Sequence, residues 1–386
     1  MLFRFLTLFT AIIFTNCARP IVLKTDYQNP EKTFKELLQL EINNSKGKLS
    51  GVSMTVIASN LDINWSGAYG FDSTEKDHLL SAQQPFRVAS ITKTFVSVAI
   101  LRLHENNKLS IDDPIADYIS EEHQSILKAD GYAPNQITIR HCLQHISGLF
   151  DYAEGNRDYI KEAKKNPRKR WTRTEQLQFA MDHGDPLGEP GTVYGYSDTG
   201  YILLGEIIEK VNNSTLAQGL RNLLSFEDLQ LKDTWLESLE PRPKEALPEV
   251  HRYFDNIDAT LWDNSIDLYG GGGLYATTQD LAKFYHALFN HKIFREKETL
   301  SLMLSPNPIT PEGKSNEDSR MGIGKITTEK SKIVIYLHTG FWNTTVVHIP
   351  KYNASIAVNY TNKDSNNVLS GTLQIIKRLS EKNAIR

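Results

Sequence analysis

The sequence predicts an α+β fold in which both ends of the chain build one antiparallel sheet. Segments with strand-like apolar patterns occur near the N-terminus and again in the last third of the chain. Between them, from about residue 109 to residue 262, loops and helical patterns predominate. The simplest fold with this order of elements is a sheet flanked by terminal helices, with a mostly helical subdomain inserted in the middle of the chain. We expect these parts to form one domain, residues 31–380.

The composition is that of an ordinary globular protein. Of the 386 residues, 40% are hydrophobic and 23% are charged, and the formal net charge is -3. This charge gives no reason to expect nucleic acid as a partner. The two cysteines are Cys17 and Cys142, and Cys142 has no neighbouring ligand residues in the sequence, so we expect it to be a buried apolar residue.

The first 17 residues have the pattern of an export signal. Arg4 is followed by the apolar segment Leu6 to Phe14, which is shorter than a typical transmembrane helix. Cys17 then stands where bacterial lipoproteins are lipidated, although ordinary cleavage nearby is the alternative. We therefore expect an exported protein, held by a lipid anchor on the periplasmic or outer side of a membrane, with residues 18–30 as a tether. A mature exported chain would contain no internal disulfide.

The elements of the first part follow from periodicity. Apolar residues at helical spacing predict an amphipathic helix over residues 31–42. Residues 51–58 and 63–69 are strand-like and are separated by the turn residues 59–62. Residues 85–88 should be extended and should lead into a largely apolar helix.

Two helices and one basic segment stand out in the middle of the chain. Residues 138–145 predict a short helix capped by Thr138, and residues 199–212 have the i, i+3, i+4 pattern of a strong helix. Between Arg157 and Arg173 lie eight Lys or Arg residues. They indicate a solvated helix and loop, with contact to an anionic surface as the alternative.

The last third returns to strands. Residues 269–275 contain four consecutive glycines and predict a loop, because the phosphate-binding pattern of strand, loop and helix is absent. A helix with a capping threonine is expected over residues 278–288 and a closing helix over residues 368–379. Strands are predicted at residues 332–337, 344–349 and 355–359, with a turn at residues 350–353.

Ser90 and Lys93 are the main candidates for chemistry. They lie three residues apart where the extended segment meets the apolar helix, so both face the same side of that helix. Free N–H groups at a helix N-terminus favour negative charge developing on the serine oxygen. Apolar surroundings would disfavour a charged lysine and make it a plausible base, which is the chemistry of an activated serine.

The spacing alone is weak evidence of function. Ser-x-x-Lys also occurs at Ser45/Lys48, Ser73/Lys76 and Ser125/Lys128, and none of these three leads into a long apolar run. The context of Ser90 and the motifs that follow it distinguish this pair.

Taken in order, five stretches resemble the serine β-lactamase and penicillin-binding-protein superfamily, particularly its class C β-lactamase-like branch of peptidases and esterases. They are residues 86–93, 143–149, 189–205, 271–282 and 338–340. Each is weak alone, but their order makes a chance match improbable. The resemblance extends over about residues 31–380 and implies a β-lactamase-like fold.

The resemblance implies roles for individual residues. Ser90 matches the nucleophile, Lys93 its partner, and Tyr196 the tyrosine of the Tyr-x-Asn motif, which could relay a proton. The stretch His338-Thr339-Gly340 stands in the place of a Lys-Thr-Gly motif, where Gly340 would let a substrate approach the backbone.

By the same resemblance, the N–H groups of Ser90 and Phe341 would form an oxyanion hole. His145 lies in the second of the five stretches, and we interpret it as structural rather than as a base.

Asp198 departs from the family pattern, since an asparagine is usual there. An ionised aspartate only accepts hydrogen bonds, so it would stabilise a charged Lys93 or select a cationic group on the substrate. His338 also departs, because it replaces a permanently charged lysine by a group that ordinarily titrates near neutrality. Both changes argue against efficient β-lactam hydrolysis.

The sequence thus favours an exported serine hydrolase that forms an acyl-enzyme on Ser90 with a small ester, an amide or a D-amino-acid peptide. It would be of the β-lactamase or D-alanyl-D-alanine carboxypeptidase type and would need no cofactor. The alternative is a catalytically silent binding or sensor protein of the same fold. A metallohydrolase has little support, because the chain lacks the usual histidine spacings. The sequence does not identify protein partners.

Overall fold

The computed structural model describes residues 25–153, 156–309, 318–328, 331–362, 365 and 367–383. The predicted signal segment, Cys17 and most of the predicted tether lie outside these residues, so the structure does not bear on them.

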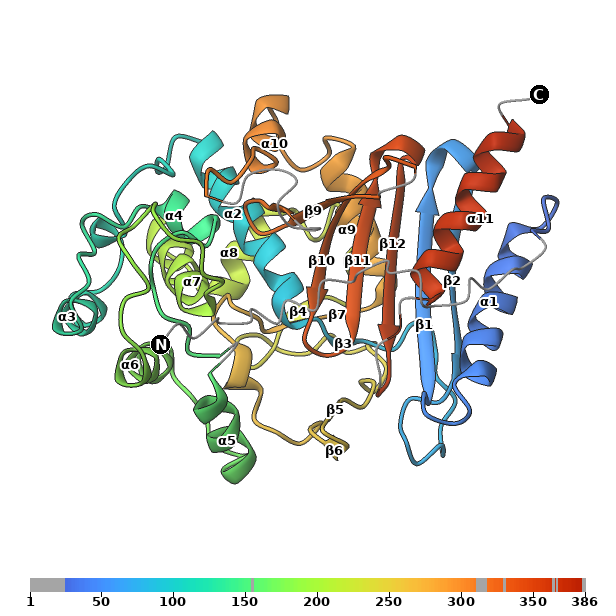
Figure 1. Cartoon of the computed structure of the whole chain (residues 1–386), viewed down its shortest axis with the longest axis horizontal. Coiled ribbons are helices and arrows are strands. Elements are labelled where there is room, and N and C mark those ends of the chain that lie inside the picture. The colour runs from blue at the N-terminus through green and yellow to red at the C-terminus, as the bar shows by residue number, and fades with distance from the viewer. Residues whose placement is uncertain are drawn as a thin grey trace, which may run out of the picture.

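The main sheet has seven strands in the order β2-β1-β12-β11-β10-β9-β8, and each neighbouring pair is antiparallel. Its strands are β1 (Gly51–Ala58), β2 (Ile63–Gly70), β8 (Asp318–Ser319), β9 (Gly324–Thr327), β10 (Val334–Gly340), β11 (Thr344–Ile349) and β12 (Ala354–Tyr360). Strand β1 pairs with β12, which joins the two ends of the chain within one sheet. The predicted α+β class and the sheet built from both ends are confirmed (Figure 1).

The two faces of this sheet are covered by different helices. On one face, α1 (Pro30–Asn44) and α11 (Asn367–Asn383) pack on apolar side chains such as Ile356 and Val358. On the other face lies α9 (Thr278–Phe289), and Ala357, between those two residues on β12, belongs to the core of that side. This alternation is the period of two expected of a strand. Figure 1 shows α1 and α11 together at one edge of the molecule.

The helical part surrounds α2 (Thr92–Glu105), which packs against α7 (Asp198–Asn212) and α8 (Leu216–Leu223). The other helices are α3 (Glu121–Ala129), α4 (Ile139–Leu143), α5 (Arg157–Lys165), α6 (Arg173–His183) and α10 (Lys297–Met303). A second sheet has the order β3-β7-β4, formed by Phe86–Arg87, Leu274–Ala276 and Trp235–Leu236. The described residues also form a hairpin of β5 (Tyr253–Phe254) and β6 (Ile257–Asp258) and several short 3₁₀ helices, among them Ala89–Ile91 and Asn264–Asp267.

Most of the predicted elements agree with the structure to within a few residues. The strands at 51–58 and 344–349 have the predicted bounds, and the predicted helix at 199–212 begins one residue earlier, at Asp198. Thr138 caps α4 as predicted, through its side chain and the N–H of His141. The threonine that caps α9 is Thr277, whose side chain accepts from the N–H of Asp280.

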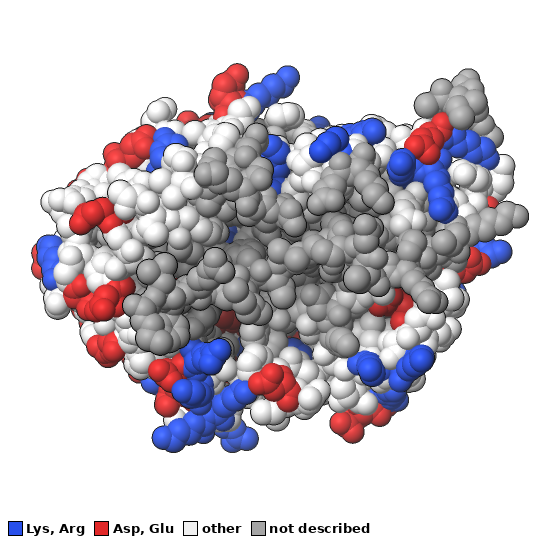
Figure 2. Space-filling model, in the orientation of Figure 1, with Lys and Arg blue, Asp and Glu red and all other residues white. Residues whose placement is uncertain are grey.

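Figure 2 shows Lys and Arg side chains gathered at the lower edge of the molecule, where Figure 1 places α5. Several of these cations have acidic partners nearby. Lys161 pairs with Asp158 at 2.7 Å, and Lys164 pairs with Asp255 at the same distance. The segment is therefore a helix and loop whose charges are partly neutralised by neighbouring carboxylates.

Two further properties follow from the described residues. Cys142 is buried with a free thiol, and burial raises its pKa to about 12, so it behaves as the small apolar residue that we expected. In the part of the chain that the structure describes, none of the helices has the length and apolar character needed to cross a bilayer.

Candidate active site

Ser90 lies at the tip of a tight connection between β3 and α2. Strand β3 pairs with β7, and the chain then passes through Ala89, whose φ of 46° lies in the left-handed region. A residue other than glycine is uncommon in this region, and such strain is concentrated at functional sites. Ala89 and Ile91 are buried, whereas Ser90 is partly exposed, so the turn presents the serine hydroxyl at the start of the helix.

Lys93 is fully buried and its amino group contacts three acceptors. It donates to Ser90 Oγ at 3.0 Å and to the carbonyl oxygen of Gly271 at 2.7 Å, and it forms an ion pair with the Asp198 carboxylate. An ammonium group has three protons, so each acceptor receives one. The structure thus brings together Ser90, Lys93 and Asp198, as predicted from their motifs.

The surroundings of the Lys93 amino group are polar, so the apolar condition under which we considered this lysine as a base is not met. A carboxylate, a carbonyl and a hydroxyl all lie within hydrogen-bond distance of this amino group. Gly271 was not identified from the sequence, because a backbone carbonyl acts as acceptor whatever the side chain is. Its lack of a side chain is nevertheless required, since a Cβ atom there would lie 2.8 Å from Asp198 Oδ1.

Asp198 is the first residue of α7, and its position is fixed from two sides. The Ser197 hydroxyl caps the helix by accepting from the N–H of Gly200 at 3.3 Å. The N–H of Asp198 donates to Asp151 Oδ1 at 2.7 Å. Asp151 was also missed, because it lies 47 residues away in a loop with no readable motif.

Tyr196 is held against the site by His145. The two rings stack with centroids 4.3 Å apart, and Lys93 Nζ lies 4.9 Å from the centroid of the Tyr196 ring. Nδ1 of His145 accepts from the N–H of Ser197 at 3.1 Å, and the His145 carbonyl accepts from the N–H of Gly195 at 2.9 Å. Burial lowers the pKa of His145 well below its ordinary value, and the nearby Lys93 adds to this effect. These contacts are those of a structural residue that positions Tyr196.

His338 is buried near the end of β10, and its Nδ1 donates to the carbonyl oxygen of Thr339 at 2.8 Å. Burial, assisted by the charge of Lys93, lowers its pKa from 6.5 to about 3. The expectation that this group titrates near neutrality is therefore wrong. At neutral pH, His338 is uncharged and its Nε2 carries no proton.

Gly340 and Phe341 stand where β10 meets the Ser90 turn. A Cβ atom at position 340 would lie 2.2 Å from the carbonyl oxygen of Val88, so only glycine allows this close approach. Thr339 is partly buried beside it, and the Phe341 ring is 54% exposed and stacks on Phe254 at 5.4 Å between centroids. The oxyanion role of the Ser90 and Phe341 N–H groups stays a prediction.

One group of residues in the described part of the chain has the spacing of a metal site. Single ligand atoms of Asp72, Asp77 and His78 lie within 4.8 Å of one another. None of the residues predicted for the Ser90 site belongs to this group.

The chain was compared with known proteins. A profile of the Beta-lactamase family matches residues 31–377. A penicillin-binding protein of Bacillus subtilis is 25% identical over 334 residues, which are 82% of this chain and 67% of the relative. A teichoic acid D-alanine hydrolase of Staphylococcus aureus is 24% identical over 290 residues, which are 74% of this chain and 64% of the relative. The chain thus spans about two thirds of the length of these relatives.

Solved structures agree in fold. A D-amino acid amidase of Ochrobactrum anthropi, in complex with L-phenylalanine amide, has a TM-score of 0.72 and is 24% identical. The match covers 94% of this chain and all of the amidase chain, and at this identity it shows the fold alone. With the family profile matching nearly the whole described chain, the resemblance inferred from the five motifs is confirmed: the chain belongs to the Beta-lactamase family.

Proposed function

We propose that this protein is a serine hydrolase that forms an acyl-enzyme on Ser90 with small esters, amides or D-amino-acid peptides. The observation that carries the proposal is the contact of 3.0 Å between Lys93 Nζ and Ser90 Oγ, in which the lysine is fixed by Asp198 and Gly271. A partly exposed hydroxyl held by a buried cation is the arrangement of an activated nucleophile.

In the proposed reaction, Ser90 Oγ attacks the substrate carbonyl carbon, and the C–O or C–N bond to the leaving group breaks. The Tyr196 oxygen takes the serine proton as the Tyr196 hydroxyl proton passes to the leaving group, so the phenol is neutral before and after the step, while Lys93 stabilises the negative charge on the oxygens around it. Water then attacks the acyl-enzyme, gives one proton back through the same relay and releases the acid. Tyr196 is assigned the relay because a Lys93 amino group that donates to three acceptors has no lone pair free to take the serine proton.

D-amino-acyl compounds are the favoured substrate class. One relative is named as a hydrolase of D-alanine on teichoic acid and one structural neighbour as a D-amino acid amidase. Efficient β-lactam turnover is disfavoured, because Asp198 and the uncharged His338 replace an amide and a cation that would hold a β-lactam.

Intact-mass analysis tests the proposal and the silent alternative together. A fluorophosphonate should add its mass to the wild-type protein and not to Ser90→Ala. Ester hydrolysis by Ser90→Ala should fall by about 10³-fold or more. Labelling that persists in the alanine variant contradicts Ser90 as nucleophile. Absence of both labelling and turnover in the folded wild type favours the binding or sensor protein. A penicillin, used in parallel, reports whether β-lactams acylate the same serine.

Export and lipid attachment at Cys17 belong to the proposal as well. They are supported by the sequence of residues 1–17. Cys17→Ser should shift the protein from the membrane fraction to the soluble fraction. Equal partitioning of the two forms would argue for ordinary cleavage.

A further inference from the structure

Asp267 is a carboxylate near the candidate active site that none of the motifs assigns. It interacts electrostatically with Lys93, Asp198 and two other buried cations, Arg87 and Arg252. Each of these three cations has its own carboxylate partner: Lys93 pairs with Asp198, Arg87 with Glu237, and Arg252 with Glu249. Asp267 is the fourth carboxylate of the group, and among the described residues it has no salt bridge.

The position of Asp267 relates it directly to the contacts of Lys93. Its Oδ2 atom lies 2.9 Å from the point where a Cβ atom of Gly272 would stand. The preceding residue, Gly271, is the one whose carbonyl oxygen receives Lys93 Nζ. A side chain at position 272 would meet the Asp267 carbonyl oxygen at 2.3 Å as well as the carboxylate, so both groups of Asp267 lie directly beside the glycine run.

The Asp267 side chain is enclosed by protein, yet the residue retains some contact with solvent. Its Oδ1 atom is buried, and no donor among the described residues reaches it. Burial raises the pKa of this carboxyl above its ordinary value, with Asp198 adding to the effect. A buried carboxylate without a partner is costly, and such groups are concentrated at binding sites.

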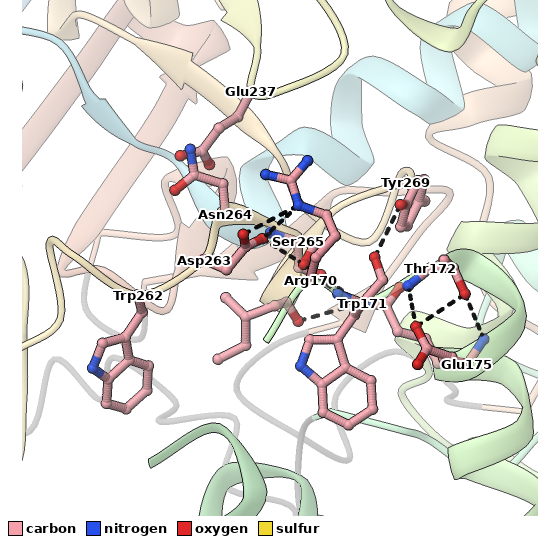
Figure 3. Close-up of polar contacts among 12 residues, drawn as sticks. Arg170, Trp171, Thr172, Glu175, Glu237, Trp262, Asp263, Asn264, Ser265 and Tyr269 are labelled. Carbon is pink, nitrogen blue, oxygen red and sulfur yellow. Dashed lines mark hydrogen bonds and ion pairs between the residues drawn. The ribbon is translucent and has the colours of Figure 1, made fainter. Parts of the chain in front are cut away.

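Asp267 ends the short 3₁₀ helix Asn264–Asp267, and residues before and after it make the contacts drawn in Figure 3. The hydroxyl of Ser265 accepts from the N–H of Trp171 at 2.6 Å, and Arg170 pairs with Asp263. After Asp267, the Tyr269 hydroxyl donates to the carbonyl of Trp171 at 3.0 Å. The carboxylate is thus presented by a rigid backbone, which suits a recognition group.

We propose that Asp267 binds the free α-ammonium group of an amino-acyl substrate. The inference rests on the proposed function, since it concerns the acyl group transferred to Ser90. An α-ammonium lies two bonds from the scissile carbonyl carbon, and Asp267 is the carboxylate beside the glycine run whose Gly271 carbonyl holds Lys93. The ammonium would form a direct salt bridge with Asp267, which the surrounding cations do not, whereas an acyl group without an amine would leave the carboxylate without one.

Two esters that differ only in the amino group test this proposal. The methyl esters of D-alanine and propionic acid are compared by proton release for wild type, Asp267→Asn and Asp263→Asn. The wild type should prefer the alanyl ester. Asp267→Asn should lower kcat/KM for the alanyl ester about 10- to 100-fold, as expected for a hydrogen bond between charged groups, and leave the propionyl ester within about threefold. Asp263→Asn, on the same loop, should affect both esters equally.

The outcomes separate this inference from the proposed function. An equal loss on both esters in Asp267→Asn, or no loss on either, overturns ammonium recognition while Ser90 chemistry stands. If the wild type hydrolyses neither ester, the proposed function is contradicted, and binding then decides the role of Asp267. In the Ser90→Ala background, calorimetry should show that D-alaninamide binds at least tenfold more tightly than propionamide, and Asp267→Asn should abolish the difference. Equal binding of the two amides overturns the inference.

Discussion

Lys93 connects the candidate nucleophile to the rest of the site. Its three contacts join the Ser90 turn, the start of α7 and the glycine run before β7. A change in any of these partners therefore changes how the lysine is held. Asp198 is the most informative of them, because it is the position at which this chain departs from the family pattern.

We expect Asp198→Asn to change the hydrolysis of amides more than that of esters. The asparagine side chain can donate as well as accept, and only an amide substrate presents an N–H that this side chain must match. The measurement is kcat/KM for p-nitrophenyl esters, D-amino-acid p-nitroanilides and a chromogenic cephalosporin. For the wild type, esters and anilides should exceed the cephalosporin. Fast hydrolysis of the cephalosporin by the wild type would contradict this interpretation of Asp198. So would an Asp198→Asn substitution that changes kcat/KM by the same factor for all three substrates.

His338 should make the fold sensitive to acid. Its pKa is about 3 in the folded protein and ordinarily 6.5, so below pH 6.5 the unfolded chain gains a proton that the folded protein does not take up. The free energy of unfolding should therefore fall between pH 6.5 and pH 4, with a contribution from His338 on the order of 1 to 3 kcal/mol at pH 4.

Urea titrations of wild type and His338→Gln at pH 7 and pH 4 measure that contribution. The acid-induced loss should be smaller in the variant. His348, which is also buried with a pKa of about 3, provides a matched control in His348→Gln. An unchanged pH dependence in both variants would mean that neither histidine stays neutral in the folded protein.

At the scale of elements, the site is made where the end of β10 meets the turn before α2. The strand itself was predictable from the apolar pattern of residues 332–337, but the structure extends β10 to Gly340, so that the site residues 338–340 belong to it. The contact between β10 and the turn was not predictable, because no sequence pattern indicates that Gly340 packs on Val88 and does not face solvent.

Two other features of the site could not be predicted for related reasons. Gly271 contributes its backbone carbonyl, which every residue type has. Asp267 stands out only because the neighbouring cations Arg87 and Arg252 form salt bridges with other carboxylates, which the sequence does not reveal. Ser90, Lys93 and Asp198 were predictable because their side chains define motifs. The partners they find depend on tertiary distances that a single sequence does not encode locally.

Gly340→Ala should force β10 and the Ser90 turn apart. The new Cβ atom would stand 2.2 Å from the Val88 carbonyl oxygen, so either the strand or the turn must move. A displacement of this size at a catalytic turn should lower kcat/KM for esters by about 100-fold. Gly200→Ala in α7 is the matched control, because its Cβ atom would lie at an ordinary 3.5 Å from Cys142. Equal activity of the two variants would show that the approach of β10 to Val88 does not matter for catalysis.

For the molecule as a whole, the sheet separates two apolar cores that have different roles. The larger core surrounds α2 and supports Ser90, and the smaller one joins α1 and α11 to the opposite face of the sheet. Because β1 and β12 carry the two ends of the chain to adjacent positions, the smaller core closes the fold on the face of the sheet opposite to the larger core. Its contribution should therefore be to stability and not to chemistry.

Leu37→Ala tests this division. Leu37 is a fully buried residue of α1, and its side chain packs against Gly371 of α11. Truncation to alanine should therefore leave a cavity between the two helices. The free energy of unfolding should fall by about 2 to 4 kcal/mol. Under conditions in which the variant remains folded, the rate of fluorophosphonate labelling at Ser90 should stay within about twofold, since the cavity lies across the sheet from α2. Leu261→Ala, at a residue that is 79% exposed, should alter neither quantity. A loss of labelling rate in Leu37→Ala that exceeds its unfolded fraction would show that the two cores are coupled through the sheet.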